Sequence, residues 1–548
     1  MEKYIPEIFL HHGIKKCGDH LSETVPEIIV DDIERTERPI SKFIVQEALE
    51  KTGFGKFNLK ITFMSIFIHT NVTINLLSIG YILPSAVCDF ELTTTKKGIL
   101  SVTPTLGTCI GALCWRFLIE SKGPKLSLIF SLFLHGSAEI CLSLLISNYW
   151  LFIFFKLISG FAAMGAINSV YIYAQNFQPT NYEKIILACL SCVFAISLIV
   201  LPLLAWAIIP LEFNFRNNNF FFGSWKLFLF IIAVPIEISA ILLIFMPETP
   251  KHLAKIGHYK EMFIVLSKMY QENNGESSDN YIASLLKCGN VALVDFVNRC
   301  QTYAKFPRTS RKNKLNYIVN DFKVQGMDII KPPYLSRLII LSLAMFSVSS
   351  ATYSMVTWFP EIIHRFSKYE LLHPNEIIDD CSISKDRPTY IDENGNFHAS
   401  HCNQSVDTSV YRTSFFMGLS AIFPNLLYLL FVDKVGFRII VAIYFSVGLL
   451  STFYIFFANS FLKNIILACI FKSVMCTTLS ILFQFNTELF PENVRILTSS
   501  IATFYSRLGI VFGNGMFAFL IDDYCPALII IVAVQLSLAI ILCISLRV

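Results

Sequence analysis

Twelve long apolar blocks, separated by polar segments, form the main pattern of this chain. Each block approaches the roughly 20 residues that a helix needs to cross a bilayer. The pattern therefore predicts an all-α membrane protein with twelve transmembrane helices. We expect the helices at about 60–83, 98–118, 126–146, 149–174, 185–209 and 225–246, and then at about 337–361, 411–432, 437–457, 462–485, 496–520 and 526–546.

The longest polar interval between apolar blocks, Pro247–Lys331, follows the sixth block. It divides the chain into two pseudo-symmetric six-helix halves, and so indicates a multi-pass membrane protein rather than a globular domain with one anchor. We predict an N-terminal tail at 1–58, a first half at 59–246, a central loop at 247–335, and a second half at 336–548 that includes an outer loop at 362–410.

Composition indicates that lipid surrounds most of the chain. Hydrophobic residues make up 54% of it and charged residues 15%, against about 25% charged in soluble domains, and the mean hydropathy is +0.57. The formal net charge of +4 is small for 548 residues and argues against a nucleic-acid partner, whose binders carry a concentrated basic face. No phosphate-binding glycine loop, zinc-type cysteine pairing or nucleophile elbow is evident. We therefore expect no enzyme, catalytic residue, metal or cofactor.

Basic residues beside the helix ends predict the orientation, because cytosolic loops carry an excess of Lys and Arg. Arg116, Lys122 and Arg495 fall on the side of the two termini, as do many basic residues of the central loop. The opposite loops hold few basic residues and several acids, among them Asp522 and Asp523. We predict that both termini and the central loop are cytosolic.

The outer loop contains two cysteines and a glycosylation sequon. Asn403-Gln404-Ser405 lies in this long hydrophilic segment, so we predict a glycan on Asn403. Cys381 and Cys402 lie on the oxidising side, where they form either a disulfide or two free thiols. Most of the 15 cysteines fall in apolar helices or inner regions, and we expect these to behave as small buried hydrophobes.

Two loops in corresponding positions of the halves repeat one another. Glu120-Ser121-Lys122-Gly123-Pro124-Lys125 follows the second block, and Asp433-Lys434-Val435-Gly436-Phe437-Arg438 follows the eighth. Paired loops of this kind indicate duplication, as in alternating-access carriers. A charge pair beside a tight glycine turn suits a reversible latch, and a charged cluster at the membrane edge is the alternative. The predicted gating residues are Glu120, Gly123, Lys125, Asp433, Gly436 and Arg438.

The second loop resembles the inner-loop signature of the major facilitator superfamily, and the first resembles a worn copy of it. Further stretches of the chain are Gly53-Phe54-Gly55-Lys56-Phe57, Leu83-Pro84-Ser85-Ala86, Ser224-Trp225-Lys226-Leu227-Phe228, Pro247-Glu248-Thr249-Pro250 and Thr357-Trp358-Phe359-Pro360. These stretches resemble the synaptic vesicle glycoprotein 2 group, and the resemblance spans about 50–546. It implies the twelve-helix facilitator fold, transport of a small molecule by alternating access, and a place in a vesicle or plasma membrane.

The same resemblance implies a substrate cavity between the halves near the midplane. Trp206, Trp358 and Arg507 match positions of the group's ligand pocket, where the tryptophans would supply stacking walls and the arginine a positive charge. The acidic pair that relatives often carry in helix 1 falls on Val72 and Asn75. The expected substrate is a small organic, anionic solute. The predicted cavity residues are Asn71, Asn75, Trp206, Trp358 and Arg507.

Charged residues inside the apolar blocks are functional candidates, because burying a charge in a bilayer costs at least about 2.5–3.5 kcal/mol. Glu139 and Glu237 are the carboxylates well inside these blocks. We predict that Glu237, close after Pro235, binds a coupled proton if transport is coupled at all, and Glu139 is the second candidate. The alternative is a neutral Glu bonded to a neighbouring helix. Lys156 and Lys472 either face the interior or extend to an interface.

Glycines recur at helical spacing in two of the blocks. Gly160 and Gly165 lie in the fourth block, and Gly509, Gly513 and Gly515 lie in the eleventh. In membrane helices this spacing is typical of close helix packing.

A second class of function stays open, in which the protein does not transport and acts as a vesicle scaffold or receptor through its tails and outer loop. The loss of the helix 1 carboxylates favours this class, whereas the retained loop at Asp433 favours transport. In both cases the lipid bilayer is a partner. We expect any cytosolic protein partner to bind the N-terminal tail.

Overall fold

Long helices fill both halves of the chain at the places where the apolar blocks predict them. The structure is a computed structural model that describes residues 42–211, 213–217, 220–286, 294, 297, 323–372, 406–457 and 461–545. The first half contains α3 (Lys56–Leu77) with its continuation α4 (Ile79–Ser85), α6 (Thr94–Lys122), α7 (Pro124–Leu144), α8 (Tyr149–Gln175), α9 (Thr180–Ile208) and α10 (Ser224–Ile244). The second half contains α16 (Tyr334–Leu372), α18 (Thr408–Ser420) followed by α19 (Ile422–Val435), α20 (Phe437–Phe456), α21 (Phe461–Leu489), α22 (Glu492–Leu520) and α23 (Cys525–Ser545).

The membrane-spanning character of these helices follows from their length and composition. Within the described ranges, nine helical stretches are long and apolar enough to cross a bilayer. The remaining predicted spans are also helical at the predicted positions, namely α18 with α19, α20, and α22. Helix α22 is the most polar of these, because it carries Arg495 and Arg507 together with several hydroxyl side chains. The predicted all-helical membrane fold is confirmed.

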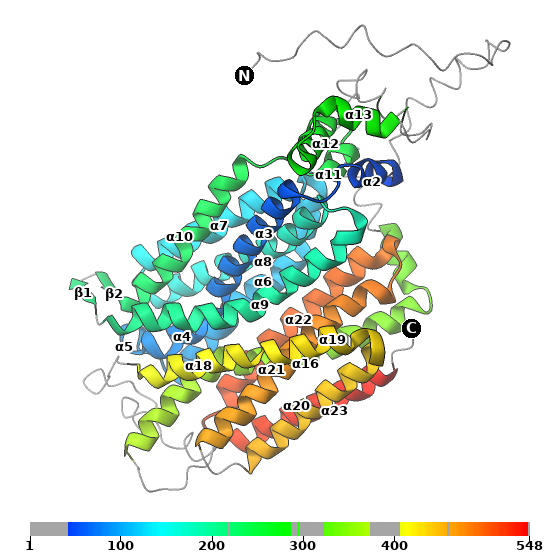
Figure 1. The fold of residues 1–548 in the computed structure, drawn as a ribbon. Helices are drawn as coiled ribbons and strands as arrows, with labels where there is room; N and C mark the ends of the chain where they lie inside the picture. Colours follow the sequence, from blue (N-terminus) through cyan, green and yellow to red (C-terminus); the bar gives the residue numbers. More distant parts are fainter. Residues whose placement is uncertain are drawn as a thin grey trace, which may run out of the picture.

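The two halves lie side by side with their helices roughly along a common axis (Figure 1, blue to green for the first half and light green to red for the second). Helix α6 packs against α22, α9 against α18, and α4 against α16. We call one end of the bundle the hairpin end, because it carries the β1–β2 hairpin. The opposite, spacer end carries the helices that follow α10. These elements are α5 (Val87–Phe90), η2 (Ile209–Leu211), β1 (Asn214–Asn217) and β2 (Phe220–Gly223) at the hairpin end, and α2 (Lys42–Glu50), α11 (Pro250–Lys255), α12 (Tyr259–Asn274) and α13 (Ser278–Leu286) at the spacer end.

One predicted boundary is wrong. Helix α16 continues to Leu372, so residues 362–372, which we expected in the outer loop, are helical. Ion pairs stabilise the extra helical turns. Arg365 pairs with Glu361 one turn earlier in α16 and with Asp522, which follows α22. An i,i+4 ion pair supports a helix that hydropathy alone would end earlier.

Glycines allow the closest approaches between helices. A Cβ on Gly160 of α8 would lie 1.9 Å from the Pro104 carbonyl oxygen of α6. Gly509 and Gly513 of α22 face the backbone of α16, where an added Cβ would lie 2.3 Å from a carbonyl oxygen in both cases. The packing prediction is confirmed for these positions and for Gly165, which lies against the Trp115 ring. Gly515 differs, since its nearest neighbour would be a side-chain methyl group at 3.8 Å.

Part of the polar spacer folds against the first half. Helices α2, α12 and α13 bury apolar side chains such as Leu49 and Met262 together, and Tyr281 donates a hydrogen bond to the Ala48 carbonyl. The Asn273 side chain of α12 accepts from the Phe57 backbone N–H at the start of α3 and donates to loop carbonyls. A Cβ on Gly55 would lie 2.8 Å from the Asn273 Cα, which explains the glycine before helix α3.

Candidate functional site

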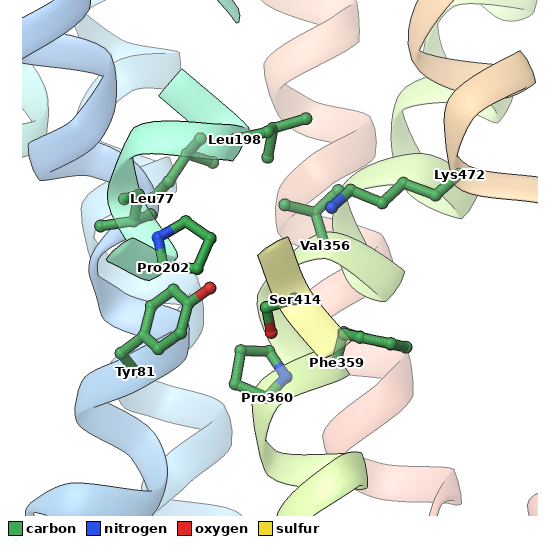
Figure 2. Close-up of a pocket in the computed structure, with 10 residues that line it drawn as sticks. Leu77, Tyr81, Leu198, Pro202, Val356, Phe359, Pro360, Ser414 and Lys472 are labelled. Atoms are coloured by element: carbon green, nitrogen blue, oxygen red, sulfur yellow. The ribbon is translucent and has the colours of Figure 1, made fainter. Parts of the chain in front are cut away.

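A small cavity lies between the two halves and is lined by both of them. Its volume is about 20 Å³, roughly the room for one water molecule. Figure 2 shows the first-half side chains of α3, α4 and α9 facing those of α16, α18 and α21 across it. The lining residues are Leu77, Tyr81, Leu198, Leu201, Pro202, Val356, Phe359, Pro360, Ser414 and Lys472.

Lys472 is the charged side chain of this lining. It extends from α21 so that its amino group points to the space between the halves (Figure 2), and only 4% of the residue is exposed. Within the described part of the chain, no hydrogen bond or ion pair reaches its Nζ, and Cys469 and Cys476 of the same helix lie close enough to interact electrostatically with it. Lys472 therefore faces the interior and does not extend to an interface.

Arg507 of α22 is a second cation between the halves. It lies beside Tyr353 of α16, and its charge also acts on His69 of α3 and Cys109 of α6. Its Nε atom is buried without a hydrogen-bond partner. These neighbours come from both halves, but Arg507 does not line the cavity of Figure 2, and its predicted cavity-facing role stays a prediction.

The two predicted stacking tryptophans lie elsewhere. On α9, Leu198 and Leu201 turn toward the cavity, whereas Trp206 is 41% exposed and does not line it. On α16, Val356 lines the cavity, whereas Trp358 is fully buried and stacks on Phe517 of α22 at 5.2 Å. Neither tryptophan lines this small cavity, and their role as stacking walls for a substrate stays a prediction.

The two predicted asparagines also differ from one another. Asn71 donates to the Phe67 carbonyl of its own helix, so the amide is partly satisfied locally. Asn75 is 2% exposed, and both its amide nitrogen and its oxygen are buried without a hydrogen-bond partner. Neither residue lines the cavity of Figure 2. Asn75 remains the stronger candidate, because a buried amide without a partner is costly unless a ligand or water completes it.

Glu139 of α7 forms an ion pair within the first half. Both of its oxygens accept hydrogen bonds from Lys156 Nζ of α8 at 2.8 Å, and Ser159 donates a third at 2.5 Å. Both charged residues are almost completely buried. Lys156 thus faces the interior, and the pair connects α7 to α8.

Glu237 of α10 is half-buried and also lies within the first half. Its Oε1 accepts a hydrogen bond from Ser137 of α7 at 2.9 Å, and it sits against Gly136, where a Cβ would lie 2.7 Å from the same oxygen. No cation pairs with Glu237 in the part of the chain that the structure describes. Neither Glu139 nor Glu237 lines the cavity between the halves.

A buried ion pair connects the halves at the hairpin end. Lys97 of α6 donates to Glu361 of α16 at 2.5 Å, and both side chains are at most 2% exposed. Arg365 donates to the same carboxylate at 3.0 Å, to Asp522 at 2.7 Å and to Thr94 of α6 at 3.4 Å. We call these five residues the hairpin-end latch. Sequence analysis missed it, although Lys97 and Glu361 at the limits of two apolar blocks were a signal.

The repeated loops lie at the spacer end. Glu120 pairs with Arg116 at 3.1 Å, and Arg116 donates across the halves to Ser500 of α22. Gly123 adopts φ 96°, and Lys125 donates to the Ile244 carbonyl. In the second loop Gly436 adopts φ 84°, a backbone conformation that favours glycine. The side chains of Asp433 and Arg438 lie outside the described residues, so their pairing stays a prediction.

Two cysteines at the hairpin end are oxidised. Cys88 of α5 and Cys525 at the start of α23 are both disulfide-bonded, which sequence analysis did not predict. Cys381, Cys402 and Asn403 lie outside the described residues, so the disulfide and the glycan of the outer loop stay predictions.

Two helical halves that pack around a small, mostly apolar cavity, with a buried ion pair between them at one end, define a multi-pass membrane carrier. Comparison with known proteins gives the family. The model of the Major Facilitator Superfamily matches residues 61–373, more than half of the chain, and the protein belongs to this superfamily. Its members are transporters, so the prediction that the chain is not an enzyme is confirmed.

Curated relatives are the synaptic vesicle glycoprotein 2 proteins, at a distance. Synaptic vesicle glycoprotein 2B of Rattus norvegicus is 22% identical over 559 residues, which cover 86% of this chain and 80% of that protein. Synaptic vesicle glycoprotein 2C of Homo sapiens is 26% identical over 336 residues, which cover 60% of this chain and 46% of that protein. The predicted resemblance is confirmed.

Solved structures with the same fold are bacterial transporters. The inward-open xylose transporter XylE from E. coli superposes with a TM-score of 0.60 at 13% identity, over 89% of this chain and 96% of that one. A bacterial homolog of the human lysosomal transporter Spinster, inward-facing and unoccupied, gives a TM-score of 0.54 at 12% identity, over 90% and 95%. At these identities the likeness supports the fold alone.

Proposed function

We propose that this protein carries a small organic anion across a membrane by alternating access. The superfamily fold implies alternating-access transport, and the charge of the solute is our inference. The observation that supports it is Arg507, a cation between the halves with no carboxylate partner in the described residues. A cation held in a low-dielectric site without a carboxylate partner attracts anions and repels cations.

The hairpin-end latch supports the alternating part of the mechanism. Lys97 belongs to the first half and Glu361 to the second, so the pair can persist only while the halves touch at that end. When the halves separate there, both charges gain water, which offsets the lost ion pair. An ion pair of this kind can open and close at modest free-energy cost, as a carrier with two access states requires.

The experiment is uptake by the purified full chain in liposomes, with labelled benzoate as an anion, glucose as a neutral solute and tetraethylammonium as a cation. We expect benzoate to enter well above empty liposomes and the other two solutes to remain near background. Arg507→Gln should reduce benzoate uptake at least tenfold, whereas Arg412→Gln, at an exposed position of α18, should leave it unchanged. Uptake of no solute would favour the scaffold or receptor alternative, and preference for the cation would contradict the anion assignment.

A further inference from the structure

We propose that Lys472 is the subsite that holds the acidic group of the substrate, and that the substrate is an apolar monocarboxylate. The proposal deepens the anion-carrier function, although binding at this subsite does not depend on transport. It begins with the burial of Lys472. The residue is 4% exposed and lacks an acidic neighbour in the described part of the chain. A buried charge without a partner is costly, and a bound carboxylate would supply that partner.

Hydroxyl groups lie where they can complete a carboxylate site. Tyr81 of α4 and Ser414 of α18 both line the cavity, with their hydroxyl groups directed toward one another from opposite halves (Figure 2). Tyr411, one helical turn before Ser414, stacks on the Tyr81 ring at 6.1 Å, and its buried hydroxyl has no hydrogen-bond partner. An ammonium group with neighbouring hydroxyl donors suits the two oxygens of one carboxylate.

The remainder of the lining is apolar and determines the body of the ligand. Leu77, Leu198, Val356 and Phe359, with the two prolines, surround the space beside Lys472. Ligand sites of this composition bind a hydrophobic body and use a few polar groups to orient it. The cavity contains no acidic lining residue, so an amine-bearing or zwitterionic ligand would bury its cation unpaired and be rejected.

The cavity volume indicates when the ligand can bind. About 20 Å³ holds one water molecule but no organic acid. Since α4 and α9 lie on one side of the cavity and α16, α18 and α21 on the other, separation of the halves would enlarge it. The subsite is therefore divided between the halves, and a ligand that contacts both Lys472 and Tyr81 would link its binding to their movement.

The test is equilibrium binding of labelled benzoate and octanoate to the purified full chain in detergent, with benzamide and octanamide as neutral isosteres. We expect at least one carboxylate to bind tenfold or more tightly than its amide. In Lys472→Gln this preference should fall to within about twofold while amide binding is unchanged. Lys472→Arg should retain it, as should Lys463→Gln, an exposed lysine of the same helix. Equal binding of acid and amide by the parent chain, or an intact preference in Lys472→Gln, would overturn the proposal.

Thermal unfolding separates a lost site from a lost fold. Removal of an unpaired buried cation removes the free-energy cost of burying its charge, so Lys472→Met should unfold at or above the thermal midpoint of the parent. Benzoate should raise the thermal midpoint of the parent but not that of Lys472→Met. A variant that unfolds well below the parent would show that Lys472 is a structural partner, and would overturn the subsite. Lys472-dependent binding without uptake would contradict the transport proposal alone, and uptake insensitive to Lys472→Gln would contradict the subsite alone.

Discussion

At the residue scale, two buried charges of the first half, Glu139 and Lys156, neutralise one another. Glu139 and Lys156 face one another across α7 and α8 with both carboxylate oxygens bonded, so they form a structural pair rather than a free proton site. Removing one member of such a pair leaves an uncompensated charge, which costs about 3–5 kcal/mol, whereas replacing both is often near neutral.

We therefore expect Lys156→Met to lower the thermal midpoint of the purified protein substantially, and the double variant Glu139→Gln with Lys156→Met to recover most of that loss. Thermal unfolding in detergent measures both. A double variant as unstable as the single one would indicate that the two charges do not compensate one another.

Glu237 is the membrane-embedded carboxylate that still supports proton coupling, because it hydrogen-bonds Ser137 and has no cation partner in the described residues. An inward pH gradient should accelerate substrate uptake by the parent chain in liposomes, and Glu237→Gln should lose that acceleration. The double Glu139/Lys156 variant is the matched control and should keep it. Equal acceleration of the parent and Glu237→Gln would exclude Glu237 as the coupling site.

At the scale of elements, backbone approach between helices sets which positions tolerate a side chain. Gly513 and Gly515 are two residues apart on α22, yet a Cβ on Gly513 would lie 2.3 Å from the Ser350 carbonyl oxygen of α16, whereas a Cβ on Gly515 would make only an ordinary contact with a methyl group at 3.8 Å. Helical geometry places them on different faces, so the spacing of glycines alone does not reveal which one is essential.

Gly513→Ala should destabilise the protein by about 1–3 kcal/mol or more, because the methyl group would force α16 and α22 apart. Gly515→Ala should stay within about 0.5 kcal/mol of the parent. The comparison of apparent thermal midpoints in detergent measures the difference. Similar midpoints for the two variants would contradict the observed contact.

At the scale of the whole molecule, the latch biases the equilibrium between two arrangements of the halves. Lys97→Met leaves the Glu361 carboxylate with one fewer cation in a buried site, which disfavours closure at the hairpin end. The reporter is Ser414→Cys in a chain whose free cysteines have been replaced. Its reaction with an impermeant maleimide added from the hairpin side should be several-fold faster when Lys97→Met is also present. Lys96→Met is the matched control, since Lys96 bonds to the nearby Glu91 carbonyl of its own half. Equal reaction rates for both variants would show that the latch does not hold the halves.

The orientation of the molecule is a further prediction at this scale. We expect the spacer end to be cytosolic, so Lys268→Cys on α12 should be labelled in intact cells only after permeabilisation, whereas Phe215→Cys on β1 should be labelled without it. The reverse labelling pattern would invert the orientation.

Glycosidase treatment should shift the electrophoretic mobility of the parent but not that of Asn403→Gln, because the second sequon, Asn71-Val72-Thr73, lies within α3.

The amino-acid sequence by itself determined the helices, their order and the division into halves. The length of an apolar segment can be read directly from the local sequence. In a bilayer such a segment forms a helix, since its backbone N–H and C=O groups must be hydrogen-bonded within the segment. The same locality explains why the close packing at the glycines of α8 was predictable. It also explains the error at α16, where residues 362–372 are polar enough to resemble a loop.

Only the tertiary structure decided which side chains meet. Sequence analysis treated Glu139 and Lys156 as separate candidates, left Lys472 between two positions, and did not detect the partners of Lys97. Each of these outcomes depends on how one helix is rotated against another. That rotation is set by the packing of small and large residues along the whole interface, so no single stretch of sequence contains it.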